Sequence, residues 1–274
     1  MKVVLSRKGF DSAAGGIPSP VINRKTMLSL PIPSDEPNGK DGCYIKYDDL
    51  EYNGVQYSDI IKNLHGRNVR YCHLDPDIRK GIRSVPNEWQ AAFGQVEGAE
   101  THLEKHNIGI GDLFLFFGLF RLADWSDRQI KYVPKSYGKH MIFGYLQIGD
   151  IIRGEQRKKY FWHPHSNDYE NPNNTIYVAA KKLVIDGTDT GLNGYGTFNY
   201  SDEIVLTKDL YSCTKWNLPA FFKDVTISFH NADCFKPDYF QSRSRGQEFV
   251  ISESQNVTDW AKKIILDNVD IDNS

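Results

Sequence analysis

The sequence predicts a mixed α+β fold rich in β-strands, in which a mixed sheet or partly closed barrel is flanked by a few helices. Short apolar runs of Val, Ile, Phe and Tyr, bounded by Gly and Asp, recur along the chain and outnumber the helical patterns. Of the 274 residues, 40% are hydrophobic and 13% are aromatic, which is enough for a substantial core. No stretch has the composition of an interdomain linker, so we expect one domain over residues 1–274.

The individual elements follow from the same patterns. The expected strands are Lys2–Ser6, Asn68–His73, Asp112–Phe120, His140–Ile148, Thr175–Ile185, Glu203–Thr207, Val225–Phe229 and Glu248–Ser252. The expected helices are Ser58–Leu64, Glu97–Asn107 and Val257–Asn268. Ser58 is a candidate N-cap of the first helix.

Two of the expected strands are flanked by similar Gly-Asp turns. Gly111–Gly118 enters its strand from such a turn, and His140–Gly149 ends its strand at another. This arrangement is similar to the strand pairing of PUA-like barrels, which include domains that recognise modified bases. Two core strands with no further role are the alternative, since Gly-Asp before an apolar strand is common in β proteins.

Charge argues against a protein that simply coats nucleic acid. Lys and Arg number 33 against 35 acidic residues, a formal charge of −2, whereas such proteins carry a basic excess. Any phosphate contact must therefore come from local clusters around a pocket. The first residues are too short an apolar run for a signal peptide, and the longest apolar stretch, Leu113–Phe120, is too short for a membrane span. We expect a cytoplasmic protein with no membrane partner.

The segment Ser6–Pro20 has an unusual concentration of special residues after an expected strand. Its glycines permit close approach to a ligand, and free N–H groups in such a loop can form an anion-binding nest. The alternative is a turn-rich connection with a solvated basic edge. Its candidate binding residues are Arg7, Lys8, Ser12, Gly15 and Gly16, and its acid is Asp11.

Two further segments carry carboxylates and imidazoles. Asp75 and Asp77 follow an expected strand, and they either hold a ligand or hard cation or cap the following turn. His163 and His165 flank a proline in a long loop. No third metal ligand is obvious in the sequence, so we favour hydrogen-bonding or acid–base roles for both histidines.

The last candidate segment precedes the final expected strand. Arg243 and Arg245 alternate with small polar residues, as in a phosphate clamp. Gln247 and Glu248 start the strand, point to opposite faces and are candidates for contacting a base or its attached sugar. A solvated basic turn is the alternative.

Five segments together resemble the third of the nucleotide-modification-associated domain families. They are Ser6–Pro20, His73–Asp77, Gly111–Gly118, His163–His165 and Gly246–Val250. The resemblance spans nearly the whole chain. It implies an association with enzymes that make, read or counter modified bases, often in conflict between phage and host, and it leaves the reaction open.

From this resemblance and the acid in the first segment we predict a DNA glycosylase. It would hydrolyse the N-glycosidic bond of a hypermodified base, for example a glucosylated hydroxymethylated one, in phage DNA. Asp11 would be the catalytic acid–base group, because base excision needs a carboxylate that stabilises an oxocarbenium-like sugar and orients water. His163 or His165 would assist the leaving base, while Arg7 and Lys8 would contact phosphates around an extruded nucleotide.

The predicted partner is DNA containing modified bases, and we predict no metal and no cofactor. Two alternatives stay open. One is a non-catalytic PUA-like reader that binds modified DNA and forms no product. The other is a nuclease or transferase that uses Asp75, Asp77 and a divalent metal.

Overall fold

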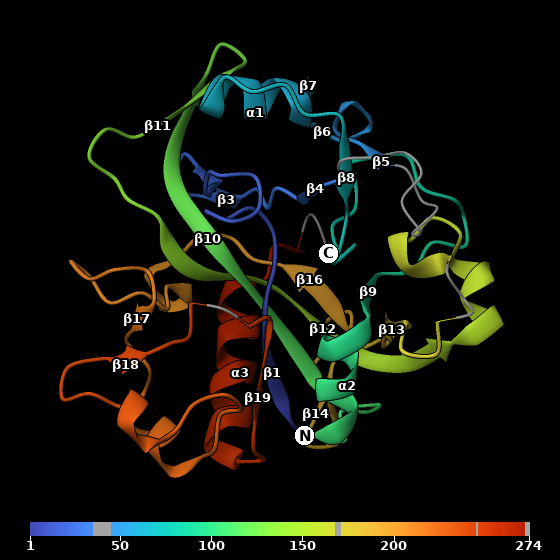
Figure 1. Cartoon of the computed structure of the whole chain (residues 1–274), viewed down its shortest axis with the longest axis vertical. Helices are drawn as coiled ribbons and strands as arrows, with labels where there is room; N and C mark the ends of the chain where they lie inside the picture. Colours follow the sequence, from blue (N-terminus) through green and yellow to red (C-terminus); the bar gives the residue numbers. More distant parts are fainter. Residues whose placement is uncertain (35–44, 168–170, 245, 272–274) are drawn as a thin grey trace.

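The computed structural model describes residues 1–34, 45–167, 171–244 and 246–271. Its centre is a ten-stranded mixed sheet with the strand order β19–β1–β10–β12–β13–β9 (Figure 1). These strands are β1 (Val3–Arg7), β9 (Ala92–Gln95), β10 (Leu113–Ser126), β12 (Lys139–Arg153), β13 (Thr175–Ala179) and β19 (Glu248–Ile251). Attached to them are β2 (Ser19–Ile22), β3 (Thr26–Met27), β11 (Gln129–Tyr132) and β16 (Tyr195–Thr197).

The sheet is mixed because β1 runs parallel to β10 and antiparallel to β19. The two strands expected from the Gly-Asp turns, β10 and β12, are antiparallel neighbours, with Leu113 opposite Gln147. The predicted α+β class is confirmed. The described strands form an open sheet rather than a closed barrel, because β19 and β9 stand at its two ends without pairing to each other.

Smaller sheets surround the main one. β4 (Ile32–Ser34), β8 (Tyr71–His73) and β5 (Ile45–Lys46) form one in that order. Three two-stranded pairs are β6 (Glu51–Tyr52) with β7 (Val55–Gln56), β14 (Val184–Ile185) with β15 (Thr188–Asp189), and β17 (Lys215–Trp216) with β18 (Phe240–Gln241).

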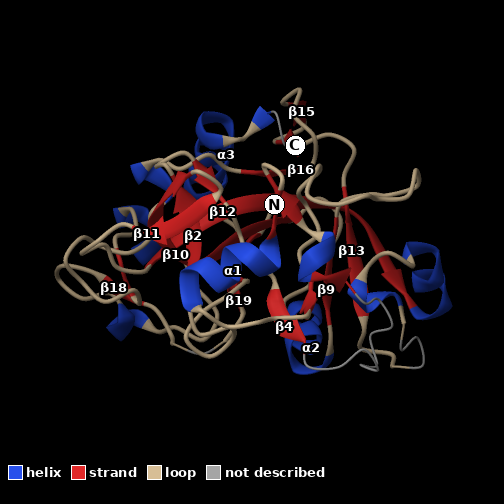
Figure 2. Ribbon diagram, turned by 90° about the horizontal axis from the view of Figure 1, so that it is seen from above, coloured by secondary structure: helices blue, strands red, loops and turns tan. Residues whose placement is uncertain are grey.

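The three expected helices are confirmed as α1 (Tyr57–His65), α2 (Glu97–Lys105) and α3 (Gln255–Asn268). Figure 2 shows α2 and α3 on opposite sides of the central strands. The predicted cap is wrong: Gln56 is the N-cap of α1, and the Ser58 hydroxyl bonds to Asp48 instead. Short 3₁₀ helices are η1 (Tyr47–Asp49), η2 (Gly154–Tyr160), η3 (Pro164–Ser166), η4 (Asp202–Ile204), η5 (Ala220–Asp224) and η6 (Ala232–Cys234).

Two expected strands are wrong. Glu203–Thr207 starts in η4 and then makes its backbone bonds to separate partners, including the His140 carbonyl, so no ladder forms. Val225–Phe229 contributes only an isolated bridge to β19, and Phe229 turns the chain with a φ of 64°. In both places apolar β-type residues pack on the sheet from irregular backbone, which a short pattern does not distinguish from a strand.

The apolar interior is divided into two hydrophobic clusters. The sheet core is built on the main sheet and α3, and it includes Leu5 and Ile78. The α1 core lies beneath α1 and includes Phe10 and Leu74. The segments 5–10 and 74–78 therefore both cross from one core to the other, and polar residues on them come together where the cores meet. No helix in the described ranges is long and apolar enough to cross a membrane.

Candidate active site at the edge of strand β9

The free edge of β9 aligns the polar segment that follows β8. Asp77 and Ala92 exchange both backbone hydrogen bonds, at 2.9 and 3.1 Å. Two residues earlier, Oδ1 of Asp75 accepts the Gly94 N–H at 2.8 Å. The carboxylate thus continues a ladder that the backbone begins, which fixes its position at the edge of the sheet.

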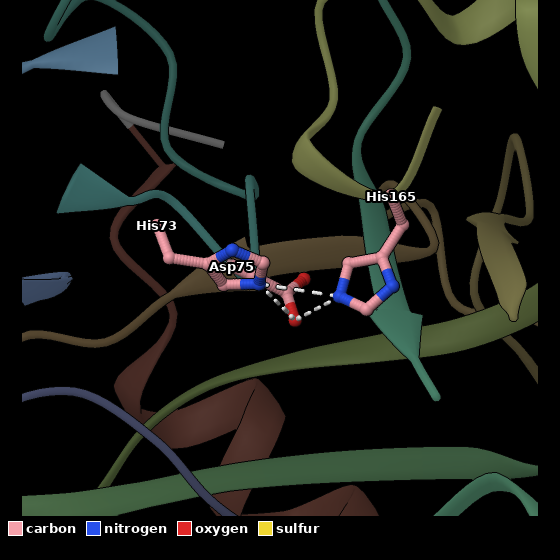
Figure 3. A group of neighbouring side chains, drawn as sticks. All are labelled: His73, Asp75 and His165. Atoms are coloured by element: carbon pink, nitrogen blue, oxygen red, sulfur yellow. Dashed lines mark hydrogen bonds and ion pairs between the residues drawn. The ribbon is translucent and has the colours of Figure 1, made fainter. Parts of the chain in front are cut away.

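Three imidazoles surround this carboxylate, and together with it they form what we call the imidazole cluster: His73, Asp75, His163 and His165. Nε2 of His73 and Nε2 of His165 are 3.2 Å apart, and they lie 3.9 and 3.8 Å from Oδ2 of Asp75 (Figure 3). Nε2 of His163 lies 3.4 Å from Oδ1. Residues 90 positions apart in the sequence therefore converge on one carboxyl group.

The loop carrying His163 and His165 is held in place by a buried cation. Arg157 of η2 is fully buried, and its guanidinium donates to the carbonyls of His165 and Asn167 at 3.2 and 3.0 Å. Gly94 leaves room for the imidazole, because a Cβ there would lie 2.2 Å from the His165 ring.

Hydrogen bonds fix the tautomers of the two loop histidines. The Asn174 side-chain N–H donates to the Asn167 carbonyl, so its Oδ1 accepts from Nδ1–H of His165 at 2.9 Å. Nε2 of His165 is then the lone-pair nitrogen. Nδ1 of His163 accepts the backbone N–H of His165 at 3.2 Å, so the proton of His163 is on Nε2, facing Asp75.

Burial and these contacts set the charges. Burial alone would raise the pKa of the Asp75 carboxyl, but the polar contact from His163 and the charges of His165 and His73 lower it well below its usual range. Burial lowers the pKa of His165 to about 3, so this imidazole is neutral at neutral pH. The carboxylate then depends on the Gly94 N–H and the His163 N–H for its stabilisation. The side chain of His73 is 26% exposed and is the member of the cluster open to a ligand.

A second polar group, the Glu248 cluster, consists of Ser6, Lys8, Gln95 and Glu248. Ser6 lies opposite Glu248 in the β1–β19 register, and Lys8 follows two residues later on the same face. Oε1 of Glu248 accepts from the Ser6 hydroxyl at 3.1 Å, the Lys8 ammonium at 2.9 Å and the Gln95 amide at 2.6 Å.

The two clusters are neighbours on the same two segments. Gln95 and Gly94 are consecutive in β9 and face opposite sides of it, one toward each cluster. Lys8 lies 4.4 Å from the Phe93 ring, and the next residue, Gly9, lines a cavity of about 30 Å³ together with Asp75. The opening segment of the chain and the Asp75 turn therefore border one region.

Several predicted site residues stabilise the fold instead of meeting at this region. Asp11 accepts from the N–H groups of Ala13 and Ala14 and forms a 2.6 Å ion pair with Arg7, so both its oxygens serve the turn. The alternative that Asp75 and Asp77 cap a helix beginning near Pro76 is wrong. The described residues 76–90 contain no helix, and Asp77 binds Arg83 at 2.6 Å and the indole N–H of Trp89 at 2.8 Å.

The remaining candidates lie on the surface or outside the described residues. Ser12 and Gly16 are exposed, and Gly15 has a φ of 82° and no room for a side chain beside Phe10. Arg243 is exposed and donates to the Phe229 carbonyl at 2.8 Å. Arg245 lies outside the described residues. Gln247 is exposed and accepts from Gln95 at 3.3 Å.

Three residues that position the chemistry were absent from the predicted site: His73, Gly94 and Asn174. His73 and Asp75 have the i, i+2 spacing that places side chains on one face of an extended segment, which is a usable sequence signal. Gly94 and Asn174 carry no such signal, because their roles depend on which loop packs over them.

The fold and the clusters define a mixed α+β protein in which three imidazoles surround one buried carboxylate, and strongly shifted pKa values of this kind gather at functional sites. The chain belongs to the nucleotide modification associated domain 3 family, whose model matches residues 2–252. This membership links the protein to modified nucleotides. No curated protein and no solved structure matches the chain significantly.

Proposed function

We propose that the protein is a DNA glycosylase that removes a hypermodified base from DNA, as in defence against phage, and that the imidazole cluster is its active site. The observation that carries the proposal is a buried, ionised carboxylate with one oxygen, Oδ2 of Asp75, turned toward two imidazole nitrogens. Family membership supplies the class of substrate.

The reaction needs few groups. Water adds to C1′ of the deoxyribose, the bond from C1′ to the base breaks with its electron pair going to the base, and the base gains a proton as it leaves. Asp75 takes the role first given to Asp11, that of accepting the proton of water and stabilising the positive sugar. His73, the most exposed imidazole of the cluster, protonates the leaving base, and the Nε2–H of His163 orients the carboxylate.

The surface beside the cluster supports contact with an extruded base. Phe161 is 62% exposed, stands two residues before His163, and packs edge-on against the buried Trp162. Its free ring face suits stacking on a base, which is tolerant of base identity. Modest overall charge fits a protein that binds a few nucleotides at one place.

The test is incubation of the purified protein with DNA containing glucosylated hydroxymethylcytosine and with the same DNA unmodified. Each reaction is run with a chelator and, separately, with added divalent ions. Abasic sites are detected by alkaline cleavage, and released bases are identified by mass spectrometry. We expect released base from the modified DNA only, and its loss by about 100-fold or more in Asp75→Asn.

The matched control is Asp150→Asn, which removes an exposed carboxylate of β12 and should leave activity unchanged. Loss of activity in Asp11→Asn with activity kept in Asp75→Asn would move the active site to the opening segment. If the protein binds the modified DNA but leaves it intact under every ion condition, the protein is a reader. The catalytic roles proposed for Asp75 and His73 are then wrong.

A further inference from the structure

We propose that His73, Asp75 and His165 bind one divalent first-row transition ion, zinc or ferrous iron. The three donor atoms come from two segments and all lie within 4.8 Å of one another. Two imidazoles with one carboxylate is a ligand set that both ions accept, and it leaves positions open for water or substrate.

The separations of the donor atoms match the size of such an ion. The separations are 3.2 Å between the two Nε2 atoms, and 3.9 and 3.8 Å from these atoms to Oδ2. The circle through three atoms at those separations has a radius of about 2.1 Å, which is the length of a bond from zinc to nitrogen or oxygen. An ion at its centre, or slightly outside the plane, reaches all three without a change of backbone.

The surrounding contacts orient the donors as a metal site requires. Asn174 fixes the proton of His165 on Nδ1, which turns the lone pair of Nε2 toward the centre. Gly94 and His163 both face Oδ1 of Asp75, which leaves Oδ2 for an ion. Contacts of this kind behind the ligands raise metal affinity by setting tautomer and ring orientation.

A further observation concerns the hydrogen bonding of the buried polar atoms in the imidazole cluster. His163 is fully buried, and its Nε2 has no hydrogen bond of good geometry among the described residues while it faces Asp75. At the centre, Nε2 of His73, Nε2 of His165 and Oδ2 of Asp75 converge, and a cation placed there would be within reach of all three. The side chains of Asp75 and His165 are 5% and 8% exposed and that of His73 is 26%, so the site is closed on one side and open on the other.

Ion binding does not depend on which bond the protein cleaves. With an ion bound, His73 and Asp75 would be its ligands, and an ion-bound water would replace them as the acid and base of the proposed reaction. A bound ion would supply a water of lowered pKa next to the substrate. The neighbouring Glu248 cluster is a poor competitor for the ion, because Lys8 already neutralises its carboxylate. Asp77, the second aspartate of the metal alternative considered from the sequence, is bound to Arg83 and Trp89 and is not a ligand.

The experiment measures the ion and not activity. Protein purified without chelator is analysed for zinc and iron by mass spectrometry. Apoprotein is then titrated with zinc, with ferrous iron under anaerobic conditions, with cobalt as a visible-absorption probe, and with magnesium as a hard ion. We expect one equivalent of zinc or iron, saturable cobalt absorption, and no competition from magnesium, which avoids imidazole ligands.

Variants locate the site. His73→Gln and Asp75→Asn should each weaken cobalt and zinc binding by about 100-fold or more, and Asn174→Ala by about 10–100-fold. His106→Gln, which removes a histidine just after α2, should bind as the wild type does. Folding of each variant is checked by circular dichroism.

Two results would overturn the proposal. One is a wild-type protein that holds no ion as purified and shows no saturable cobalt absorption, a measurement that needs no variant. The other is unchanged affinity in folded His73→Gln. Ion binding without base release would support the metal site and contradict only the proposed glycosylase reaction.

Discussion

The imidazole cluster and the Glu248 cluster lie on opposite faces of β9, and each has one buried carboxylate. In the Glu248 cluster three donors, one of them the Lys8 ammonium, meet a single carboxylate oxygen. In the imidazole cluster two donors face Oδ1 of Asp75, while Oδ2 faces two more nitrogens. The first carboxylate is paired with the Lys8 ammonium, whereas the second is surrounded by imidazoles, of which His165 is kept neutral by burial, which lowers its pKa.

By this difference the Glu248 cluster is a structural ion pair, and the imidazole cluster is a candidate site for chemistry. A buried charge that is already paired stabilises the fold only while both partners are present. A buried carboxylate with one oxygen turned toward imidazoles is less stable by itself and can take part in chemistry, because a water, a substrate or an ion can bind to that oxygen. Removing Lys8 should therefore affect folding most, whereas changes around Asp75 should affect binding most.

The largest effect is expected from Lys8→Met. It leaves the Glu248 carboxylate buried, at 2% exposure, without a counterion, which should lower the free energy of unfolding by about 3–5 kcal/mol. His73→Gln, at the partly exposed side of the other cluster, should cost about 1 kcal/mol or less. Urea denaturation followed by fluorescence measures both.

The double variant Lys8→Met/Glu248→Gln is the control for this prediction. It removes the unpaired charge and keeps an acceptor for Ser6 and Gln95, so it should recover at least about 2 kcal/mol of the loss. Equal losses in Lys8→Met and His73→Gln would show that the two clusters do not differ in the way described.

A smaller effect is expected from Gly94→Ala, on the strand between the clusters. The added Cβ would lie 2.2 Å from the His165 ring, and the imidazole must move away. We expect a loss of about 1–3 kcal/mol of stability from overpacking, measured by denaturation, together with weaker cobalt binding. Gly98→Ala in α2 is the matched control: no atom lies within 4 Å of its Cβ, and the change should stabilise the helix by up to about 1 kcal/mol.

If Gly94→Ala loses stability but keeps wild-type cobalt affinity, His165 is not a ligand. If it keeps both, the packing of this ring against β9 is looser than the contact distance implies.

Local sequence patterns identified several residues of each cluster, but not which of them contact one another. Lys8, Asp75, His163, His165 and Glu248 were all predicted as site residues from local patterns. Their grouping depends on the register of β1 with β19 and on the packing of a loop against β9, and neither is encoded within a short window.

The choice of Asp11 as the catalytic acid shows the limit most clearly. A glycine-rich loop with an acid and two cations reads as a ligand site, but the same residues also build a self-contained turn. Here the carboxylate accepts two backbone N–H groups of its own loop and pairs with Arg7. Turn chemistry and anion binding use the same residue types, so composition alone does not separate them.

The last prediction concerns a buried imidazole away from both clusters, and its effect is the smallest when it is expressed per pH unit. It tests whether burial alone keeps a histidine neutral in this fold. His140 is 1% exposed, and its Nδ1 accepts the indole N–H of Trp216 at 3.0 Å. A proton on Nδ1 would face that N–H. Burial, with a smaller contribution from the charge of Arg7, lowers the pKa of His140 to about 3, while Asp11 acts in the opposite direction.

Because this pKa is depressed in the folded state, the unfolded chain binds the proton first as the pH falls. The contribution of His140 to stability is complete above the usual pKa of about 6.5 and is lost progressively between that pH and about 3, by at most about 1.4 kcal/mol per pH unit. Denaturation of the wild type and of His140→Gln at several pH values in that window measures the difference in slope. A shallower slope in His140→Gln is expected. Identical slopes would mean that His140 is protonated within the fold, and that burial does not by itself account for a neutral His165.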